Sequence, residues 1–315
     1  MPARLGAVRK VAAACAVTAL TTFCAPLPAN AAPLPAPEPT ARYVALGSSY
    51  AAGGSLGPAD PADSGGRCGR TTIAYPYLVA EQLHLNLTNA TCGGASIPNI
   101  AATPQQIWSW NGSSQTGELQ INAVTADTDL VTITVGGNDV NYVGNLMAEA
   151  CLGDLAANPQ SVISNQLKVY GLCTPVTDAV VQARLAGIQD ALTATVDAVQ
   201  KKAPRARVVL VDYLSVLPDN GMPCPAVPIP QQRQKFLLNV ARGMSLATKH
   251  AAQQTGAELV AVSKDSQGHD ACSTDPWVTG YDFSKGFVMM HPNEAGHAAV
   301  AKALVNQLTH PGLSF

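Results

Sequence analysis

Short runs of apolar residues recur along the chain, and each is closed by glycine or by a polar segment. The most regular run covers residues 130–135, in which β-branched residues predominate and two glycines follow. Such runs are typical of strands that are buried on both faces. We therefore predict strands at residues 43–46, 130–135, 208–211 and 258–262.

Longer segments between these runs carry apolar residues at helical spacing. Asp178 and Asn293 stand where N-caps are expected, and Pro204 and Gly256 stand just beyond expected helix ends. The helices predicted in this way cover residues 75–83, 178–203, 231–255 and 293–308.

Strands of this kind, alternating with helices, predict a parallel sheet with helices on both sides. The expected fold class is therefore α/β, with three layers in the order α/β/α. Ligands of such folds bind beyond the carboxyl ends of the strands. Residues 47–49 and 136–139 combine glycine with polar side chains, and both segments follow predicted strands.

The first 31 residues have the three parts of a secretory signal peptide. Basic residues precede a short apolar stretch, and residues 29–31 form a small-x-small cleavage motif. We expect secretion, with removal of the signal near Ala31 and Ala32. Residues 32–41 are predicted to be a proline-rich linker, and residues 42–315 a single catalytic domain.

Charge and hydropathy exclude several classes of partner. The net charge is −2 and only 13% of residues are charged, so no basic surface for nucleic acid is expected. No later apolar stretch reaches the roughly 18 residues of a membrane span, so stable membrane insertion is not expected. The cysteines and histidines lack the spacing typical of metal ligands. We expect a monomer.

Six cysteines remain beyond the predicted signal peptide. An even number in an exported chain predicts three disulfides. The sequence does not choose among the pairings by itself, and pairing between nearest neighbours is the one we expect. It joins Cys68 with Cys92, Cys151 with Cys173, and Cys224 with Cys272.

Four motifs that lie far apart in the chain carry groups suited to acyl transfer. Ser49 follows a strand-ending glycine and is expected at a helix start, where backbone N–H groups favour negative charge. Gly94 lies in a glycine turn that can bring an N–H group near a reacting carbonyl, and Asn138 offers an amide donor. His291, directly before the last predicted helix, is a base with a pKa near neutrality.

In this order, Ser49, Gly94, Asn138 and His291 match the four sequence blocks of the SGNH (GDSL-type) hydrolases. The chain resembles the secreted actinobacterial esterases and lipases of that family. The resemblance implies a flavodoxin-like α/β/α fold without metal or organic cofactor. It also implies ester hydrolysis through an acyl-Ser49 intermediate, with His291 as general base. The oxyanion would be held by the N–H groups of Ser49 and Gly94 and by Asn138.

Two positions depart from the family pattern. Ser48 replaces the aspartate of the usual Gly-Asp-Ser motif, so a second serine precedes the expected nucleophile and is the alternative to it. Val288 stands where an aspartate often precedes the histidine by three residues. We expect the backbone carbonyl of Val288 to accept the Nδ1 proton of His291, with Asp282 or Asp275 as the alternative partner.

These motifs do not specify the ester that is cleaved. The expected substrate is a small-molecule or lipid ester, and phospholipase A or carbohydrate (acetyl) esterase activity is the alternative on the same machinery. The non-enzymatic alternative is an inactive relative that binds lipid or glycan. Trp108 and Trp110 either line an acyl-binding cleft or belong to a half-buried extended segment.

Overall fold

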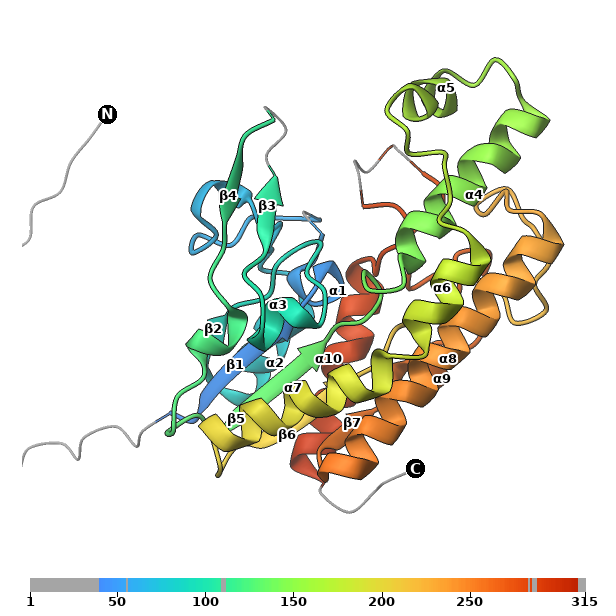
Figure 1. Ribbon diagram of the computed structural model, residues 1–315. Helices are drawn as coiled ribbons and strands as arrows, with labels where there is room; N and C mark the ends of the chain where they lie inside the picture. The colour runs from blue at the N-terminus through green and yellow to red at the C-terminus, as the bar shows by residue number, and fades with distance from the viewer. Residues whose placement is uncertain (1–39, 55, 109–111, 283, 285–287, 311–315) are drawn as a thin grey trace, which may run out of the picture. The chain divides into compact units, whose positions relative to one another are not determined.

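A five-stranded parallel sheet forms the centre of the molecule (Figure 1). The computed structural model describes residues 40–54, 56–108, 112–282, 284 and 288–310. The predicted signal peptide lies outside the described residues, as does the predicted linker up to residue 39. Both therefore stay predictions.

The strands are Asn86–Asn89 (β2), Arg42–Gly47 (β1), Leu130–Thr134 (β5), Arg207–Val211 (β6) and Glu258–Val260 (β7). They follow one another across the sheet in the order β2-β1-β5-β6-β7. β5 is buried at every position and β1 at every position but the first, because both have a strand on each side and helices above and below. β2 is a polar edge strand with half of its residues exposed, so the apolar pattern does not reveal it.

The helices are α1 (Ser49–Ala52), α2 (Tyr75–Leu83), α3 (Pro98–Ala101), α4 (Tyr142–Ala157), α5 (Val162–Val169), α6 (Asp178–Leu185), α7 (Ile188–Lys202), α8 (Gln231–Thr255), α9 (Val262–Asp265) and α10 (Glu294–Thr309), with 3-10 turns at Ser64–Gly66 and Gln120–Ala123. α7 and α8 pack together on one face of the sheet, and α2 and α10 pack together on the other (Figure 1). The predicted three-layer α/β/α fold is confirmed.

The segment predicted as one long helix, residues 178–203, forms two helices. α6 ends at Leu185 and α7 begins at Ile188, and Gly187 lies between them. The N-cap of α6 is Thr177 and not Asp178. Asp178 is the first residue of the helix, and both of its carboxylate oxygens accept hydrogen bonds from Arg233 of α8, at 2.7 and 2.8 Å. The carboxylate of Asp178, which was predicted to cap the helix, therefore forms an ion pair with Arg233 instead.

The predicted cap of the last helix is present. The Asn293 side chain accepts a hydrogen bond from the Gly296 N–H at 2.9 Å. The strand expected at residues 258–262 is shorter than predicted and ends at Val260, because Val262 already begins α9.

Trp108 belongs to a small antiparallel hairpin of β3 (Gln106–Trp108) and β4 (Ser114–Thr116). Its side chain is 70% exposed, whereas the preceding Ile107 is buried. Trp108 therefore lies on the solvent side of an extended segment. Trp110 lies outside the described residues.

Three disulfides link parts of the chain that the strands and helices leave apart. They join Cys68 to Cys92, Cys151 to Cys173, and Cys224 to Cys272, which is the nearest-neighbour pairing. The first of them ties the loop after α1 to the loop after β2. Within the described residues, no helix is both long enough and apolar enough to cross a membrane.

Candidate active site

The carboxyl end of β1 turns directly into a helix at Ser49. Gly47 makes this turn with a φ of 144°, and a Cβ atom there would lie 2.3 Å from the Thr134 carbonyl oxygen. Only glycine fits so close to the neighbouring strand. The Ser48 N–H then donates to the same Thr134 carbonyl at 2.9 Å. Ser49 is the first residue of α1, so no carbonyl of its own helix can accept its N–H.

The two adjacent serines face different groups. Ser48 is 1% exposed, and its Oγ lies 3.2 Å from the Tyr213 hydroxyl. Ser49 Oγ lies 2.7 Å from His291 Nε2. The geometry therefore pairs the histidine with Ser49, as expected from the motif, and assigns Ser48 to the core.

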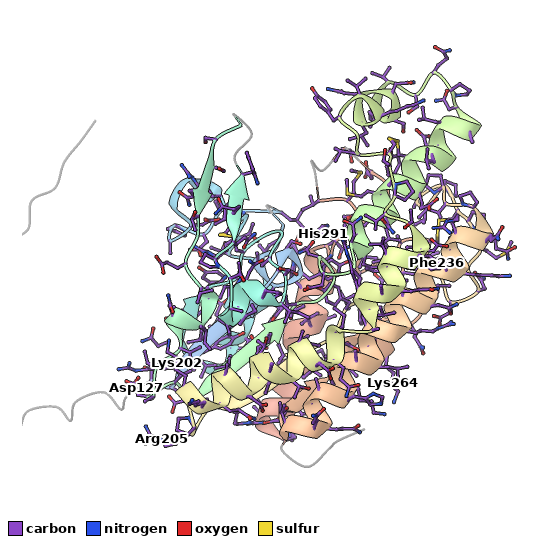
Figure 2. The ribbon with its side chains drawn as sticks, viewed as in Figure 1. Asp127, Lys202, Arg205, Phe236, Lys264 and His291 are labelled. Atoms are coloured by element: carbon purple, nitrogen blue, oxygen red, sulfur yellow. A yellow bond between two sulfur atoms is a disulfide. The ribbon has the colours of Figure 1, made fainter. Side chains whose placement is uncertain are left out.

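His291 approaches Ser49 from the segment before α10 (Figure 2). Its Nδ1 lies 2.7 Å from the backbone carbonyl oxygen of Met289. A carbonyl only accepts hydrogen bonds, so Nδ1 carries the proton and Nε2 is free to accept one from Ser49. Burial lowers the pKa of His291 below its usual value of 6.5, and the hydrogen bond to Met289 partly opposes this effect.

The expected partner of His291, the Val288 carbonyl, is not the one that the structure shows. The Val288 carbonyl oxygen accepts a hydrogen bond from the Thr279 hydroxyl at 2.6 Å. Met290 has a left-handed backbone with φ of 59°, and this turn directs the Met289 carbonyl to the imidazole instead. His291 Nδ1 is bonded to a backbone carbonyl, as predicted, but that carbonyl belongs to Met289 and not to Val288.

Two hydroxyl groups hold this histidine segment in its conformation. The Tyr50 hydroxyl donates to the Met290 carbonyl at 2.6 Å, and Tyr50 directly follows Ser49. The Thr279 hydroxyl also lies 3.2 Å from the His291 N–H, which donates to it. A left-handed backbone at a residue other than glycine costs roughly 1–2 kcal/mol, and these contacts offset that cost.

The two carboxylates considered as alternative partners have other contacts. Asp282 accepts hydrogen bonds from the backbone N–H and the hydroxyl of Ser284, both at 2.8 Å. Asp275 lies 3.3 Å from Nδ1 of His269, to which its backbone carbonyl is also bonded. Among the described residues, no carboxylate is hydrogen-bonded to His291.

Gly94 and Asn138 lie on the loops after β2 and β5, the strands on either side of β1. These two loops are joined directly. The Asn138 side chain donates to the Ala95 carbonyl at 2.8 Å, and the Asp139 carboxylate accepts the Ile97 N–H at 3.1 Å. Burial raises the pKa of Asp139 to about 6. Gly94 has a φ of 77°, and its N–H has no acceptor in the described part of the chain.

Ser49, Gly94 and Asn138 therefore follow three adjacent strands and lie at the carboxyl edge of the sheet, where ligands bind in such folds.

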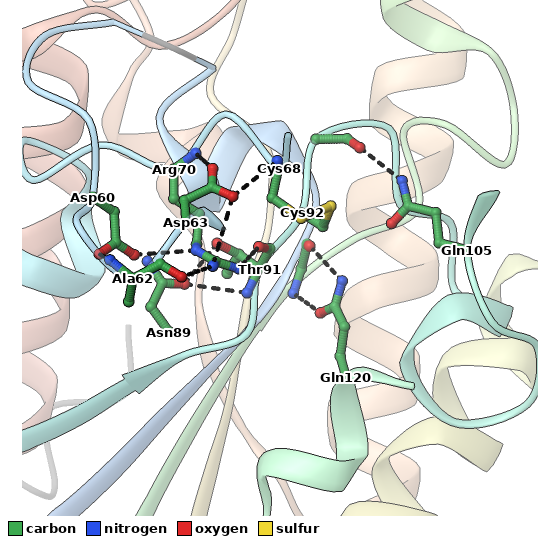
Figure 3. Close-up of a disulfide and its surroundings, with 12 residues drawn as sticks. Asp60, Ala62, Asp63, Cys68, Arg70, Asn89, Thr91, Cys92, Gln105 and Gln120 are labelled. Atoms are coloured by element: carbon green, nitrogen blue, oxygen red, sulfur yellow. Dashed lines mark hydrogen bonds and ion pairs between the residues drawn. A yellow bond between two sulfur atoms is a disulfide. The ribbon is translucent and has the colours of Figure 1, made fainter. Parts of the chain in front are cut away.

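Sequence reasoning missed two glutamines that hold these loops (Figure 3). Gln120 accepts the Gly47 N–H at 2.7 Å and donates to the Gly47 carbonyl at 3.0 Å. Gln105 donates to the Gly93 carbonyl at 2.7 Å. Both are buried, yet both contact backbone atoms in loops, where no periodic pattern marks them.

The described residues contain no group of three or more His, Cys, Asp or Glu side chains able to hold a metal ion.

The three-layer α/β/α fold, with the candidate site at the carboxyl edge of its parallel sheet, is that of the SGNH hydrolases. Residues 45–299 match the GDSL-like Lipase/Acylhydrolase family, and the chain belongs to that family. It is a carboxylic ester hydrolase.

The chain is 31% identical to Lipase 2 of Streptomyces coelicolor over 285 residues, which cover 89% of this chain and 90% of that lipase. It is 29% identical to a lipase of Streptomyces rimosus, over 75% of each chain.

Two solved structures share the fold. A phospholipase A1 from Streptomyces albidoflavus aligns with a TM-score of 0.63 and 22% identity, over 86% of this chain and 99% of that one. An extracellular lipase from Streptomyces rimosus aligns with a TM-score of 0.60 and 26% identity, over the same shares of the two chains.

Proposed function

We propose that the protein cleaves carboxylic esters outside the cell, with Ser49 as nucleophile and His291 as general base. The observation that carries this proposal is the chain of contacts from Ser49 Oγ to His291 Nε2 and from His291 Nδ1 to the Met289 carbonyl, at 2.7 Å each. A serine hydroxyl becomes a strong nucleophile when a positioned base takes its proton.

The reaction proceeds in two halves. Ser49 Oγ attacks the ester carbonyl carbon as its proton passes to His291 Nε2, and a tetrahedral oxyanion forms. The imidazolium returns the proton to the leaving alcohol, the C–O bond to that alcohol breaks, and acyl-Ser49 remains. Water then attacks the acyl carbon as it gives a proton to the same imidazole. The bond between that carbon and Ser49 Oγ breaks, Oγ takes the proton back from His291, and the acid leaves.

The negative charge of each tetrahedral intermediate is held by hydrogen-bond donors. These are the backbone N–H groups of Ser49 and Gly94 and the side-chain amide of Asn138. The N–H of Ser49 also stands at the start of α1, where unpaired N–H groups favour an anion.

The Met289 carbonyl takes the place of the aspartate of a Ser-His-Asp triad. By accepting the Nδ1 proton, it fixes the tautomer and the orientation of His291, the two functions of the aspartate that depend on position and not on charge. It is neutral, so it stabilises the imidazolium less than a carboxylate does. The lowered pKa of His291 is consistent with this environment, because it keeps the imidazole unprotonated at neutral pH.

Export is supported by two features of the chain and by the description of a related protein. Residues 1–31 have the pattern of a signal peptide, with cleavage expected near Ala31 and Ala32. The three disulfides suit an oxidising compartment. A related lipase from Streptomyces rimosus is described as extracellular.

The test is hydrolysis of p-nitrophenyl esters from acetate to palmitate by the mature protein and by Ser49→Ala. We expect kcat to fall by about 10⁵-fold or more in Ser49→Ala, as in other serine hydrolases that lose the nucleophile. The matched control is Ser48→Ala, which removes the neighbouring hydroxyl and should keep activity within about tenfold.

A fluorophosphonate probe adds a direct readout of the nucleophile. It should label the wild type and Ser48→Ala once, and leave Ser49→Ala unlabelled. Labelling of Ser49→Ala, or full activity in that variant, would contradict the proposal.

The acyl length at which kcat/KM is largest separates an esterase from a lipase. Phosphatidylcholine and acetylated xylan test the phospholipase and carbohydrate esterase alternatives.

A further inference from the structure

The peptide group between Gly93 and Gly94 is held in place by a side chain from a distant loop. Gln105 Nε2 donates to the Gly93 carbonyl at 2.7 Å (Figure 3). On the preceding peptide group, the Gly93 N–H donates to the Cys68 carbonyl, also at 2.7 Å. Cys68 is itself bonded to Cys92, so the glycine turn is fastened on both sides.

The hydrogen bond from Gln105 determines where the Gly94 N–H points. The Gly93 carbonyl and the Gly94 N–H belong to one planar peptide group, and no described peptide bond is cis. In a trans peptide group the C=O and N–H bonds point in opposite directions. A donor that fixes the carbonyl on one side therefore directs the N–H to the other side.

This peptide group depends on hydrogen bonds for its orientation. It lies between two glycines, which have no Cβ atom to restrict rotation of the peptide plane. Gly94 has a left-handed backbone with a φ of 77°. A cavity of about 220 Å³ is lined in part by Gln105, Gln120 and the disulfide. In the described structure, no other side chain donates to the Gly93 carbonyl.

The buried side chain of Gln105 makes one hydrogen bond within the described residues, the one to the Gly93 carbonyl. The residue is 9% exposed, and its backbone carbonyl accepts the Gly117 N–H at 2.8 Å at the base of the β3–β4 hairpin. Its side-chain oxygen Oε1 is buried without a hydrogen-bond partner in the described protein. A buried amide that uses only its donor end costs stability, and such groups call for an explanation.

We propose that Gln105 is a positioning residue that aims the Gly94 N–H at the oxyanion of the reaction. The inference rests on the proposed function, because it takes Gly94 as an oxyanion donor. Gln105 acts through the Gly93 carbonyl and does not touch the substrate. Its loss should therefore weaken binding of the transition state and leave binding of the ground-state ester unchanged.

The experiment compares Gln105→Met, which keeps the length but has no donor, with Gln105→Glu, which replaces the donor by a carboxylate. We expect kcat for p-nitrophenyl butyrate to fall by about 10- to 100-fold in both, less than on deleting a donor outright, with KM within about twofold. The matched control is Gln106→Ala. Gln106 is the exposed neighbour, whose Nε2 donates to Thr116 Oγ1 at 2.8 Å, and its loss should leave kcat unchanged.

A second readout separates positioning from a general structural effect. An alkyl trifluoromethyl ketone forms a tetrahedral oxyanion on Ser49, so its inhibition constant should rise by about the same factor as kcat falls. A kcat within twofold of wild type in either folded variant would overturn the proposal. So would a loss of kcat without a matching change in the inhibition constant. Activity that survives in Ser49→Ala would instead overturn the proposed function itself.

Discussion

The two halves of the active site are held in place by different kinds of contact. On the nucleophile side, the sheet and buried side-chain amides hold the loops that carry Ser49 and the proposed oxyanion donors. Gln120 bonds both the N–H and the carbonyl of Gly47. On the histidine side, His291 is oriented by the carbonyl of Met289, which is part of its own segment.

This difference between side-chain and backbone contacts predicts which substitutions the site should tolerate. The nucleophile side depends on the identity of its residues, since Gly47 has no room for a Cβ atom and Asn138 supplies a side-chain donor. The histidine side depends on a backbone conformation, and the carbonyl of Met289 would be present with any residue at that position. Apart from Ser49 and His291 themselves, loss of a functional atom should therefore cost most on the nucleophile side.

The strongest test of this contrast that leaves the catalytic pair intact is Asn138→Ala. We expect kcat to fall by about 100- to 1,000-fold, because one oxyanion donor is lost while Ser49 can still be acylated. Steady-state kinetics with p-nitrophenyl butyrate, together with fluorophosphonate labelling, measures both effects. Unchanged turnover would remove Asn138 from the site.

The pH dependence of kcat/KM tests the histidine side. His291 acts as a base only when it is neutral, and burial lowers its pKa below 6.5. We therefore expect an acid limb with a midpoint below pH 6.5, beneath which kcat/KM falls about tenfold for each pH unit. A midpoint above pH 6.5 would contradict a base held by a neutral carbonyl in a buried site.

Acid unfolding must be separated from this limb, because a second histidine opposes folding at low pH. His297 is fully buried, and burial, together with the nearby His291, lowers its pKa from 6.5 to about 3. The unfolded chain binds this proton below about pH 6.5, whereas the folded chain does not until about pH 3. Stability should therefore decrease as the pH falls through this window, and circular dichroism at each pH serves as the control.

Much of the fold could be predicted because burial leaves a pattern in the sequence. The runs at residues 43–46, 130–135 and 208–211 are apolar because both faces of these strands are covered. β2 left no such pattern, since it lies at the edge of the sheet with polar residues half exposed. The break at Gly187 was also missed, because the helical periodicity on either side continues across it.

The sequence led to the candidate site where the proposed function requires a particular side chain. Ser49 and His291 have the chemistry of a nucleophile and a base, so their types and order are visible in a motif. The choice between the carbonyls of Val288 and Met289 depends on the φ angle of Met290 and on the hydroxyl of Thr279, neither of which a motif encodes. Contacts of that kind require the three-dimensional structure.

A smaller effect is expected from Tyr50→Phe, which removes one hydroxyl group from the histidine side. The Met290 carbonyl would lose its donor at 2.6 Å, and an unpaired buried carbonyl costs about 1–3 kcal/mol. We expect a lower melting temperature and a kcat lower by about tenfold, because the segment that orients His291 becomes less ordered. Thermal unfolding and kinetics measure the two effects. Unchanged values of both would show that the left-handed turn at Met290 does not need this contact.

The smallest effect should come from the carboxylates that a conventional triad would require. Asp275→Asn and Asp282→Asn each remove a carboxylate that was considered as the acid of a triad, but they change no described contact of His291. Because its Nδ1 proton is already bonded to the Met289 carbonyl, kcat should stay within about twofold of wild type in both variants. In a triad, the same substitution reverses the tautomer of the histidine and lowers kcat by about 10⁴-fold. A loss of that size in either folded variant would therefore mean that a carboxylate orients His291 during turnover. It would also mean that the histidine side, like the nucleophile side, depends on one particular side chain.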